Sequence, residues 1–289
     1  MKNLFTLVSL TLIVAVFAFM VACGGGEEKQ AETKMLMIKG SDTMVHLCSS
    51  WAEHFMNTHE GSEVSVTGGG SGTGIAALIN GTTDICAASR KIKEKEITLA
   101  EEQGIHPLEH VVALDGIAVC INPENPINEL TIEQLGKIFT GAYTSWSQVG
   151  GPDEKIIVLS RESSSGTYVF FQEEVLNKKD YTTEARLMPA TSSIVQATEA
   201  DKWAIGYIGL GYASEAGNKI KVLAVKVDDA SAAVIPSTAT VLDGTYSIAR
   251  PLHLYTKGEP TGIAAEFLNF CLSPEGQNIV AETGYVKVK

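Results

Sequence analysis

The sequence lacks the short motifs by which many metal- and nucleotide-dependent enzymes are recognised. It contains no CxxC or CxxH pair and no HExxH, so no zinc site is expected. The glycine-rich run that ends at Gly74 continues with Ile75-Ala76, where a P-loop has Lys followed by Ser or Thr, and it does not contain GxGxxG. A nucleophile elbow, GxSxG, is missing because Glu162 stands at the first glycine position of residues 162–166. The spacing of the residues therefore favours no enzyme class, and neither a metal nor a cofactor is expected.

Positive charge is also scarce. The chain has 22 Lys and Arg against 34 Asp and Glu, a net charge of −12. Removal of residues 1–22, which contain one lysine and no acid, would leave 21 − 34 = −13. Such a chain lacks the positive field that attracts phosphate backbones, so no nucleic-acid partner is expected. If it binds an anion, it must use local donors in a closed site.

The N-terminus carries the features of a secretory signal. Lys2 precedes an apolar run over residues 4–21, and Met20-Val21-Ala22-Cys23 resembles a bacterial lipobox. We expect residues 1–22 to be a lipoprotein signal peptide, Cys23 to be lipidated and the Gly-, Glu- and Lys-rich residues 23–33 to be a flexible tether. The protein would then be lipid-anchored in the cell envelope, on the extracytoplasmic or periplasmic side. The alternative is a permanent transmembrane helix, for which the run is of borderline length.

The rest of the chain has the composition of a globular protein. With 289 residues, 45% of them hydrophobic, it is long enough for two lobes that each bury a core. Four further cysteines lie in apolar stretches and are expected to be buried free thiols: Cys48, Cys86, Cys120 and Cys271.

Predicted strands alternate with predicted helices from Met35 onward. Strands are predicted at residues 35–38, 63–67, 84–88, 111–121 (broken at Asp115-Gly116), 155–160, 204–208, 219–227 and 251–255. Helices are predicted at residues 45–55, 74–79, 93–103, 131–139 (with Thr131 as its cap), 167–176, 260–271 and 274–282. This alternation indicates an α/β fold with mainly parallel sheets, and no repeat of 20–50 residues suggests a solenoid.

Three clusters of Ser, Thr and Gly lie between a predicted strand and a predicted helix, at residues 40–44, 68–74 and 161–167. The start of a helix presents unpaired N–H groups and the positive end of the helix dipole. Glycines allow a ligand to come close, and hydroxyls add donors, so such a segment can bind an anion. One cluster alone would more often be a helix cap. Three in one chain favour anion binding.

A fourth segment, residues 84–90, ends in Ser89-Arg90 at the carboxyl end of a predicted strand, where α/β proteins bind ligands. Arg90 and Arg161 could each offer a forked pair of donors to an oxyanion. The alternative is that Arg90 is a surface arginine that opens the basic run Lys91, Lys93 and Lys95.

Taken in order, these motifs resemble those of the phosphate-binding proteins of Pst-type phosphate ABC transporters, from about Lys34 to the C-terminus. The resemblance rests on GSDTM, GGGSGTG, DICAASR, LDGIAVCINPENP and RESSSGT. It implies a two-lobed periplasmic-binding-protein fold of type II, a Venus flytrap. Residues 34–114 plus 246–289 would form lobe one and residues 115–245 lobe two, with hinge strands near 115–119 and 245. It also implies a monomer that delivers inorganic phosphate to ABC transporter permease subunits and is not an enzyme.

The resemblance also implies which residues bind phosphate. They are Ser41, Thr43, Met44, Ser71, Gly72, Ser89, Arg90, Arg161, Ser165, Gly166 and Thr167. The best-known members carry an aspartate just after the strand of the fourth segment, where this chain has Ser89-Arg90, and that aspartate accepts the proton that phosphate bears and sulfate lacks. Here another acid must take over, with Asp42 and Asp115 as candidates, or the selectivity is weaker. The alternatives are a binder of sulfate or molybdate, a secreted phosphoester hydrolase, and a scaffold or adhesin without transport coupling.

Overall fold

The computed structural model describes residues 34–288; the predicted signal peptide, the tether and the lipidation at Cys23 lie outside them. Nine strands of the described part form one sheet. Eight of them follow the order β2-β1-β3-β11-β4-β8-β6-β7, and the ninth, β9, pairs with β4 off this path. They are β1 (Lys34–Gly40), β2 (Ser62–Thr67), β3 (Ile85–Ala88), β4 (Leu108–Ile121), β6 (Ile157–Arg161), β7 (Arg186–Met188), β8 (Ala204–Gly209), β9 (Lys221–Val222) and β11 (Ala249–Thr256). Two short strands, β5 (Glu129–Thr131) and β10 (Ala224–Lys226), pair separately.

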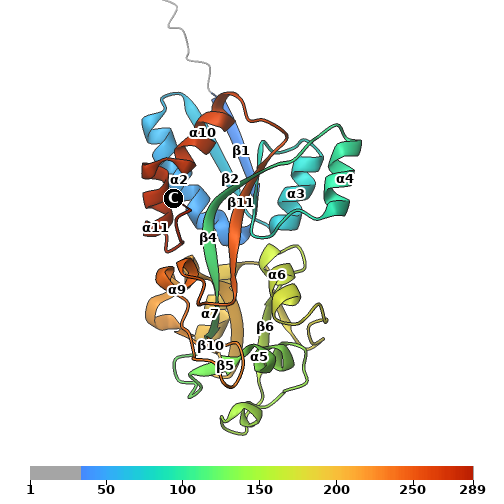
Figure 1. The fold of residues 1–289 in the computed structure, drawn as a ribbon, viewed down its shortest axis with the longest axis vertical. Coiled ribbons are helices and arrows are strands. Elements are labelled where there is room, and N and C mark those ends of the chain that lie inside the picture. Colours follow the sequence, from blue (N-terminus) through green and yellow to red (C-terminus); the bar gives the residue numbers. More distant parts are fainter. Residues whose placement is uncertain (1–33, 289) are drawn as a thin grey trace, which may run out of the picture. The chain divides into compact units, whose positions relative to one another are not determined.

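Helices pack around the sheet both at its β2-β1-β3-β11 end and at its β8-β6-β7 end (Figure 1). Those packed around β1, β2, β3 and β11 are η1 (Asp42–Met44), α2 (Val45–Thr58), α3 (Ser71–Ile79), α4 (Glu94–Glu102), α10 (Gly262–Leu272) and α11 (Pro274–Glu282). Those of the intervening segment are α5 (Ile132–Phe139), η2 (Trp146–Val149), α6 (Gly166–Glu174), α7 (Thr191–Ala200), α8 (Leu210–Ala216), η3 (Gly217–Lys219) and α9 (Thr238–Leu242).

The long strand β4 belongs to both parts of the sheet. Its residues up to Gly116 pair antiparallel with β11, and its residues from Ile117 pair antiparallel with β8. Parallel pairs, β1 with β2 and β3, and β6 with β7 and β8, lie on either side. We call residues 34–116 and 249–288 the first half and residues 117–248 the second half. The structure is thus a mixed α/β fold of the predicted class, in which antiparallel pairs occur where the chain crosses between the halves.

The predicted break in β4 at Asp115-Gly116 is wrong, because the strand runs unbroken through both residues. Asp115 is fully buried and accepts hydrogen bonds, so its charge does not end the strand. Gly116 pairs with Ala249, and a Cβ on it would lie 2.8 Å from Val241 Cγ2. The glycine therefore allows close packing rather than a turn.

Other elements of the second half also differ from the prediction, whereas the cap of α5 agrees with it. The predicted strand 219–227 is two short strands, because β9 pairs with β4 while β10 pairs with β5, with buried Leu223 between them. The helices α7 and α8 were not predicted. Thr131 caps α5 as expected, since its Oγ1 accepts a hydrogen bond from Gln134 N at 3.1 Å.

Each half has its own apolar core. In the first half, Trp51 and Phe55 of α2 pack with Phe267 of α10. In the second half, Phe171 of α6 stacks on Tyr207 of β8 with ring centroids 4.2 Å apart. The four predicted thiols are buried and form no disulfide within residues 34–288. Every helix in this range is too short or too polar to cross a membrane.

His253 of β11 is a buried ionisable group in the first half, only 1% exposed. Burial lowers its pKa to about 4, against the attraction of Glu109, whose Oε1 lies 2.9 Å from Nδ1. Histidine in the unfolded chain titrates near pH 6.5, so between pH 6.5 and 4 the unfolded state binds the extra proton. Folding stability is therefore fully present above pH 6.5 and falls as the pH drops toward 4.

We predict that this residue alone lowers the free energy of unfolding by up to about 2 kcal/mol between pH 7 and pH 5. Urea unfolding at the two pH values measures the difference. His253→Gln should flatten the dependence, whereas His54→Gln, at an exposed position on α2, should leave it unchanged. An unaltered pH dependence in His253→Gln would refute the assignment.

Candidate anion-binding site

The first predicted loop leads from β1 into η1 and lies against the end of β3. Gly40 has a φ of 146°, and a Cβ on it would collide with the carbonyl oxygen of Ala87. This close approach lets Ser41 N donate a hydrogen bond to Ala87 O at 2.7 Å. Ser41 and Thr43 are thereby buried beside Ser89, which follows β3.

The second loop turns through Gly69 and Gly70, with φ of 108° and 99°, into the start of α3. Gly70 N donates to Gly40 O at 2.9 Å, which ties this loop to the first. Gly72 N donates to the carbonyl oxygen of Ser164 at 2.9 Å. Since Ser164 belongs to the third loop, the two halves touch here through main-chain atoms.

The third loop joins β6 to α6 in the second half. Ser165 caps α6, because its Oγ accepts from Thr167 N at 3.2 Å and from Tyr168 N at 3.4 Å. Ser165 and Thr167 are each 2% exposed. The loop therefore presents buried residues at the start of a helix, as the sequence predicted.

These loops bring five hydroxyl groups together, which we call the hydroxyl cluster: Ser41, Thr43, Ser71, Ser89 and Thr167. Ser41 Oγ donates to Ser89 Oγ at 2.9 Å, and Ser71 Oγ lies 3.2 Å from Ser89 Oγ. Thr43 Oγ1 and Thr167 Oγ1, from opposite halves, are 2.8 Å apart. Gly166 closes the cluster, because a Cβ on it would collide with Ser71 Oγ.

Three backbone N–H groups beside the cluster donate no hydrogen bond to any residue between 34 and 288. They belong to Thr43, Ser71 and Gly166, in the first turns of η1, α3 and α6. Each points from the positive end of a helical segment, which favours an anion. The arrangement thus combines free main-chain donors with hydroxyl groups from both halves.

Two other predicted ligands are directed elsewhere. Arg161 is 2% exposed, and its guanidinium donates to Met188 O at 3.2 Å, Pro189 O at 2.9 Å and Thr191 Oγ1 at 2.8 Å. Met44 lies in the apolar core, and its N–H donates to Ser41 O at 3.0 Å.

Arg90 forms a two-pronged ion pair with Glu96 of α4, with N–O distances of 2.8 and 2.7 Å. Burial acts to raise the pKa of Glu96, but hydrogen bonds from Arg90 and from Lys93 N hold it below its usual value. Arg90 still borders the site, since its Nη2 lies 3.8 Å from the position of a Cβ on Gly72. The carboxylate neutralises much of the charge that Arg90 would offer to an anion.

Both candidate carboxylates already have partners. Asp42 Oδ2 accepts from Thr191 N at 2.6 Å and lies 3.3 Å from Arg161 Nη2. Asp115 Oδ1 accepts from Leu210 N at 2.9 Å, and its Oδ2 accepts from Arg250 Nη2 at 3.0 Å.

Arg250 of β11 is a residue that sequence reasoning missed. It is 4% exposed, donates to Ser89 O at 2.7 Å through Nη1 and to Thr167 Oγ1 at 3.0 Å through Nη2. Burial raises the pKa of Asp115, and the Arg250 guanidinium and Leu210 N–H oppose that rise. The sequence did contain a sign of this role, because Arg250 stands beside Pro251 in an otherwise apolar strand. An arginine in such a strand is buried and needs an acidic partner such as Asp115.

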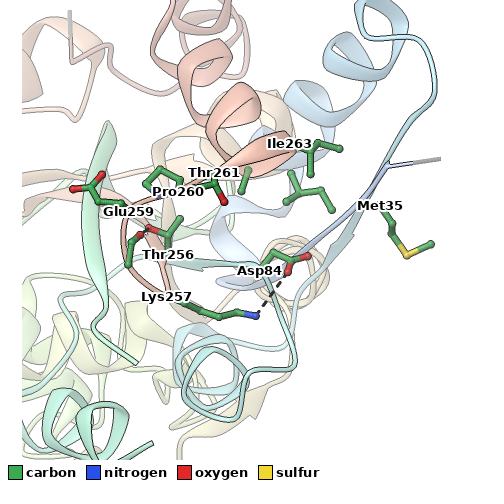
Figure 2. Close-up of a pocket in the computed structure, with 11 residues that line it drawn as sticks. Met35, Asp84, Thr256, Lys257, Glu259, Pro260, Thr261 and Ile263 are labelled. Carbon is green, nitrogen blue, oxygen red and sulfur yellow. Dashed lines mark hydrogen bonds and ion pairs between the residues drawn. The ribbon is translucent and has the colours of Figure 1, made fainter. Parts of the chain in front are cut away.

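Cavities lie both beside the hydroxyl cluster and away from it. One of about 300 Å³ is lined by Arg90, Phe170, Arg250 and His253, and its link to the cluster is Arg250, which donates to Ser89 O and Thr167 Oγ1. Another of about 360 Å³ lies at the other end of β1, near Met35 and Pro260, where Lys257 Nζ is 3.8 Å from Asp84 Oδ1 (Figure 2). None of the residues predicted to bind an anion lines the second cavity.

The site and fold can be compared with known proteins. Residues 25–275 match the family described as the PBP superfamily domain. The phosphate-binding protein PstS of Staphylococcus epidermidis is 33% identical over 286 residues, which cover 96% of this chain and 87% of that protein. The chain belongs to the Pst-type phosphate-binding protein family.

Other members show how far the likeness extends. The protein SphX of Synechococcus elongatus is 34% identical over 90% of this chain and 79% of its own length. A putative phosphate ABC transporter substrate-binding protein from Clostridium perfringens, solved with bound phosphate, is 31% identical with a TM-score of 0.80. That alignment covers 89% of this chain and all of that one. Family membership thus rests on nearly the whole described part.

The buried pair of Asp115 and Arg250 leads to a stability prediction. Asp115→Asn would leave the guanidinium of Arg250 buried without its counter-charge, which should cost about 3–5 kcal/mol of unfolding free energy. Glu184→Gln is the control, because it removes an exposed ion pair with Lys155 at 2.7 Å, which solvent screens and which should contribute little to stability. Urea unfolding followed by circular dichroism compares the two; equal, small losses would contradict the prediction.

Proposed function

We propose that this protein captures inorganic phosphate between its two halves, at the hydroxyl cluster, and delivers it to the permease subunits of an ABC transporter. The observation that carries the proposal is the meeting of three helix starts, whose N–H groups at Thr43, Ser71 and Gly166 have no acceptor within the described residues. A hydrogen bond to a charged group contributes about 1.5–3 kcal/mol. Several such bonds would offset the repulsion from a net charge of −12.

The relatives support the choice of ligand. Proteins named for phosphate binding align over nearly the whole chain, and one of similar fold holds phosphate. We assign the direct contacts to the hydroxyl cluster with Ser165 and Gly166. Gly72, whose N–H donates to Ser164 O, would hold the second loop against the third. Arg161 and Arg90 would contribute positive charge from the border of the site, and Met44 would support the first loop.

The proposed function includes an N-terminal lipid anchor and two lobes that move relative to each other. We infer a lipoprotein signal over residues 1–22, a lipid at Cys23 and a tether over residues 23–33. The protein would act as a monomer outside the cytoplasm. Residues 34–114 plus 246–289 and residues 115–245 would be lobes that rotate about the strands near 115–119 and 245.

Recognition of the phosphate proton is assigned to serine hydroxyls. Asp42 and Asp115 flank the site, but each already accepts from donors of its own. Ser41, Ser71 and Ser89 form a chain in which each hydroxyl can accept as well as donate. A hydroxyl accepts the proton of hydrogen phosphate, yet it can also donate to fully ionised sulfate. Sulfate should therefore be excluded less strictly than by a buried carboxylate.

Isothermal titration with phosphate, sulfate and molybdate tests this. We expect phosphate to bind with micromolar or tighter affinity and sulfate to bind measurably but more weakly. No heat with phosphate would refute the proposed function. Complete rejection of sulfate would show that a carboxylate, rather than a serine, recognises the proton.

A second prediction concerns Gly166. Its hydrogen atom faces Ser71 Oγ, and the position of a Cβ would be 2.7 Å from Ser89 Oγ, so Gly166→Ala should push both hydroxyls away. We expect at least a tenfold loss of phosphate affinity, roughly that of one hydrogen bond to a charged ligand. Gly136→Ala on α5 is the control, since its Cβ would meet only Val175 O at 3.1 Å. An unchanged dissociation constant in Gly166→Ala would place phosphate elsewhere.

A further inference from the structure

Asp42 links the two halves more extensively than its neighbours in the first loop do. Its Oδ2 accepts from the backbone N–H of Thr191 at 2.6 Å and lies 3.3 Å from Arg161 Nη2. Its carbonyl oxygen accepts from Tyr212 Oη at 3.3 Å. Asp42 belongs to the first half and all three partners to the second, so each contact exists only while the halves are together.

The contact with Thr191 replaces a missing helix cap. The residue at the N-cap position of α7 is Ala190, which has no side-chain oxygen and makes no capping hydrogen bond. Helix starts favour Ser, Thr, Asp or Asn at that position because a side-chain oxygen pairs with an otherwise free N–H. Here the oxygen comes from the opposite half, across 149 residues of sequence.

The carboxylate of Asp42 also balances the buried positive charge of Arg161. Arg161 is buried, and its other hydrogen bonds go to the neutral oxygens of Met188, Pro189 and Thr191. Burial lowers the pKa of Arg161, and the charge of Asp42 is the leading influence that opposes this. Arg161 and the positive end of α7 together therefore favour an anion, and Asp42 supplies one from within the chain.

We propose that Asp42 is a positioning residue that sets ligand affinity by acting as a built-in anion: its carboxylate caps α7 and pairs with Arg161, which holds the halves closed around the hydroxyl cluster. Its effect on affinity rests on the proposed function, whereas its effect on closure does not. Part of the closed state's stability is then independent of the ligand. Less of the ligand's binding free energy is then needed to bring the halves together, so its apparent affinity is higher.

The experiment uses two readouts on the whole protein, with Asp42→Asn and Asp42→Ala as variants. Hydrogen exchange in phosphate-free solution reports whether the amides at the start of α7 are protected. Titration with inorganic phosphate, with stopped-flow rates, reports affinity. The matched control is Asp84→Asn, because Asp84 also accepts a backbone N–H, that of Met37 at 2.9 Å, and also lies near a cation, Lys257, but within the first half.

We expect exchange at the start of α7 to accelerate about tenfold or more in Asp42→Ala, and less in Asp42→Asn, whose amide oxygen can still accept. The phosphate dissociation constant should rise about tenfold to a hundredfold, mainly through faster release, as for loss of a charge-assisted bond. Asp84→Asn should change neither.

Two results would overturn the proposal: unaltered exchange at α7, or phosphate binding as tight as or tighter than in the unmodified protein. The second would mean that Asp42 competes with the ligand for Arg161. If no form of the protein binds phosphate but exchange at α7 still accelerates, the proposed function is wrong, while closure by Asp42 is supported.

Discussion

The buried ion pair between Asp115 and Arg250 is the interaction on which the rest of the site depends. Asp115 lies on β4, where this strand leaves β11 and joins β8, and it also accepts the N–H that follows β8. Arg250 reaches from β11 to Ser89 and to Thr167, one in each half. One guanidinium therefore fixes the crossing strands and two members of the hydroxyl cluster. Desolvation makes such a pair costly, and its several hydrogen bonds are what offset the cost.

The loops of the site could be predicted because their signals are local. Glycines followed by Ser or Thr at the end of a strand indicate a helix start wherever they occur, and the clusters at Ser41, Ser71 and Ser165 needed no knowledge of distant residues. The order of strands and helices followed from hydrophobic periodicity for the same reason. The break expected in β4 failed because a buried acid can be matched by a distant partner, which periodicity does not show.

The partners of the charged residues could not be predicted. Arg90 and Arg161 are both arginines at the carboxyl ends of strands. Arg90 pairs with Glu96, six residues away, whereas Arg161 pairs with Asp42 of the opposite half. A long arginine side chain can reach several acceptor oxygens, and which of them it pairs with depends on the packing of the folded protein. The short strands β9 and β10 were misjudged likewise, since each is fixed by its neighbour rather than by its own pattern.

The seam between the halves is built partly from main-chain atoms: Gly72 N–H meets the carbonyl oxygen of Ser164, and Gly166 lies against Ser71. Main-chain groups are the same for every residue type. The link between Gly72 and Ser164 therefore survives a change of side chain at Ser164. The contacts of Thr43 with Thr167 and of Asp42 with Thr191 depend instead on the side chains that make them. The docking of the halves thus has one part that tolerates substitution and another that fixes the residue types on both sides.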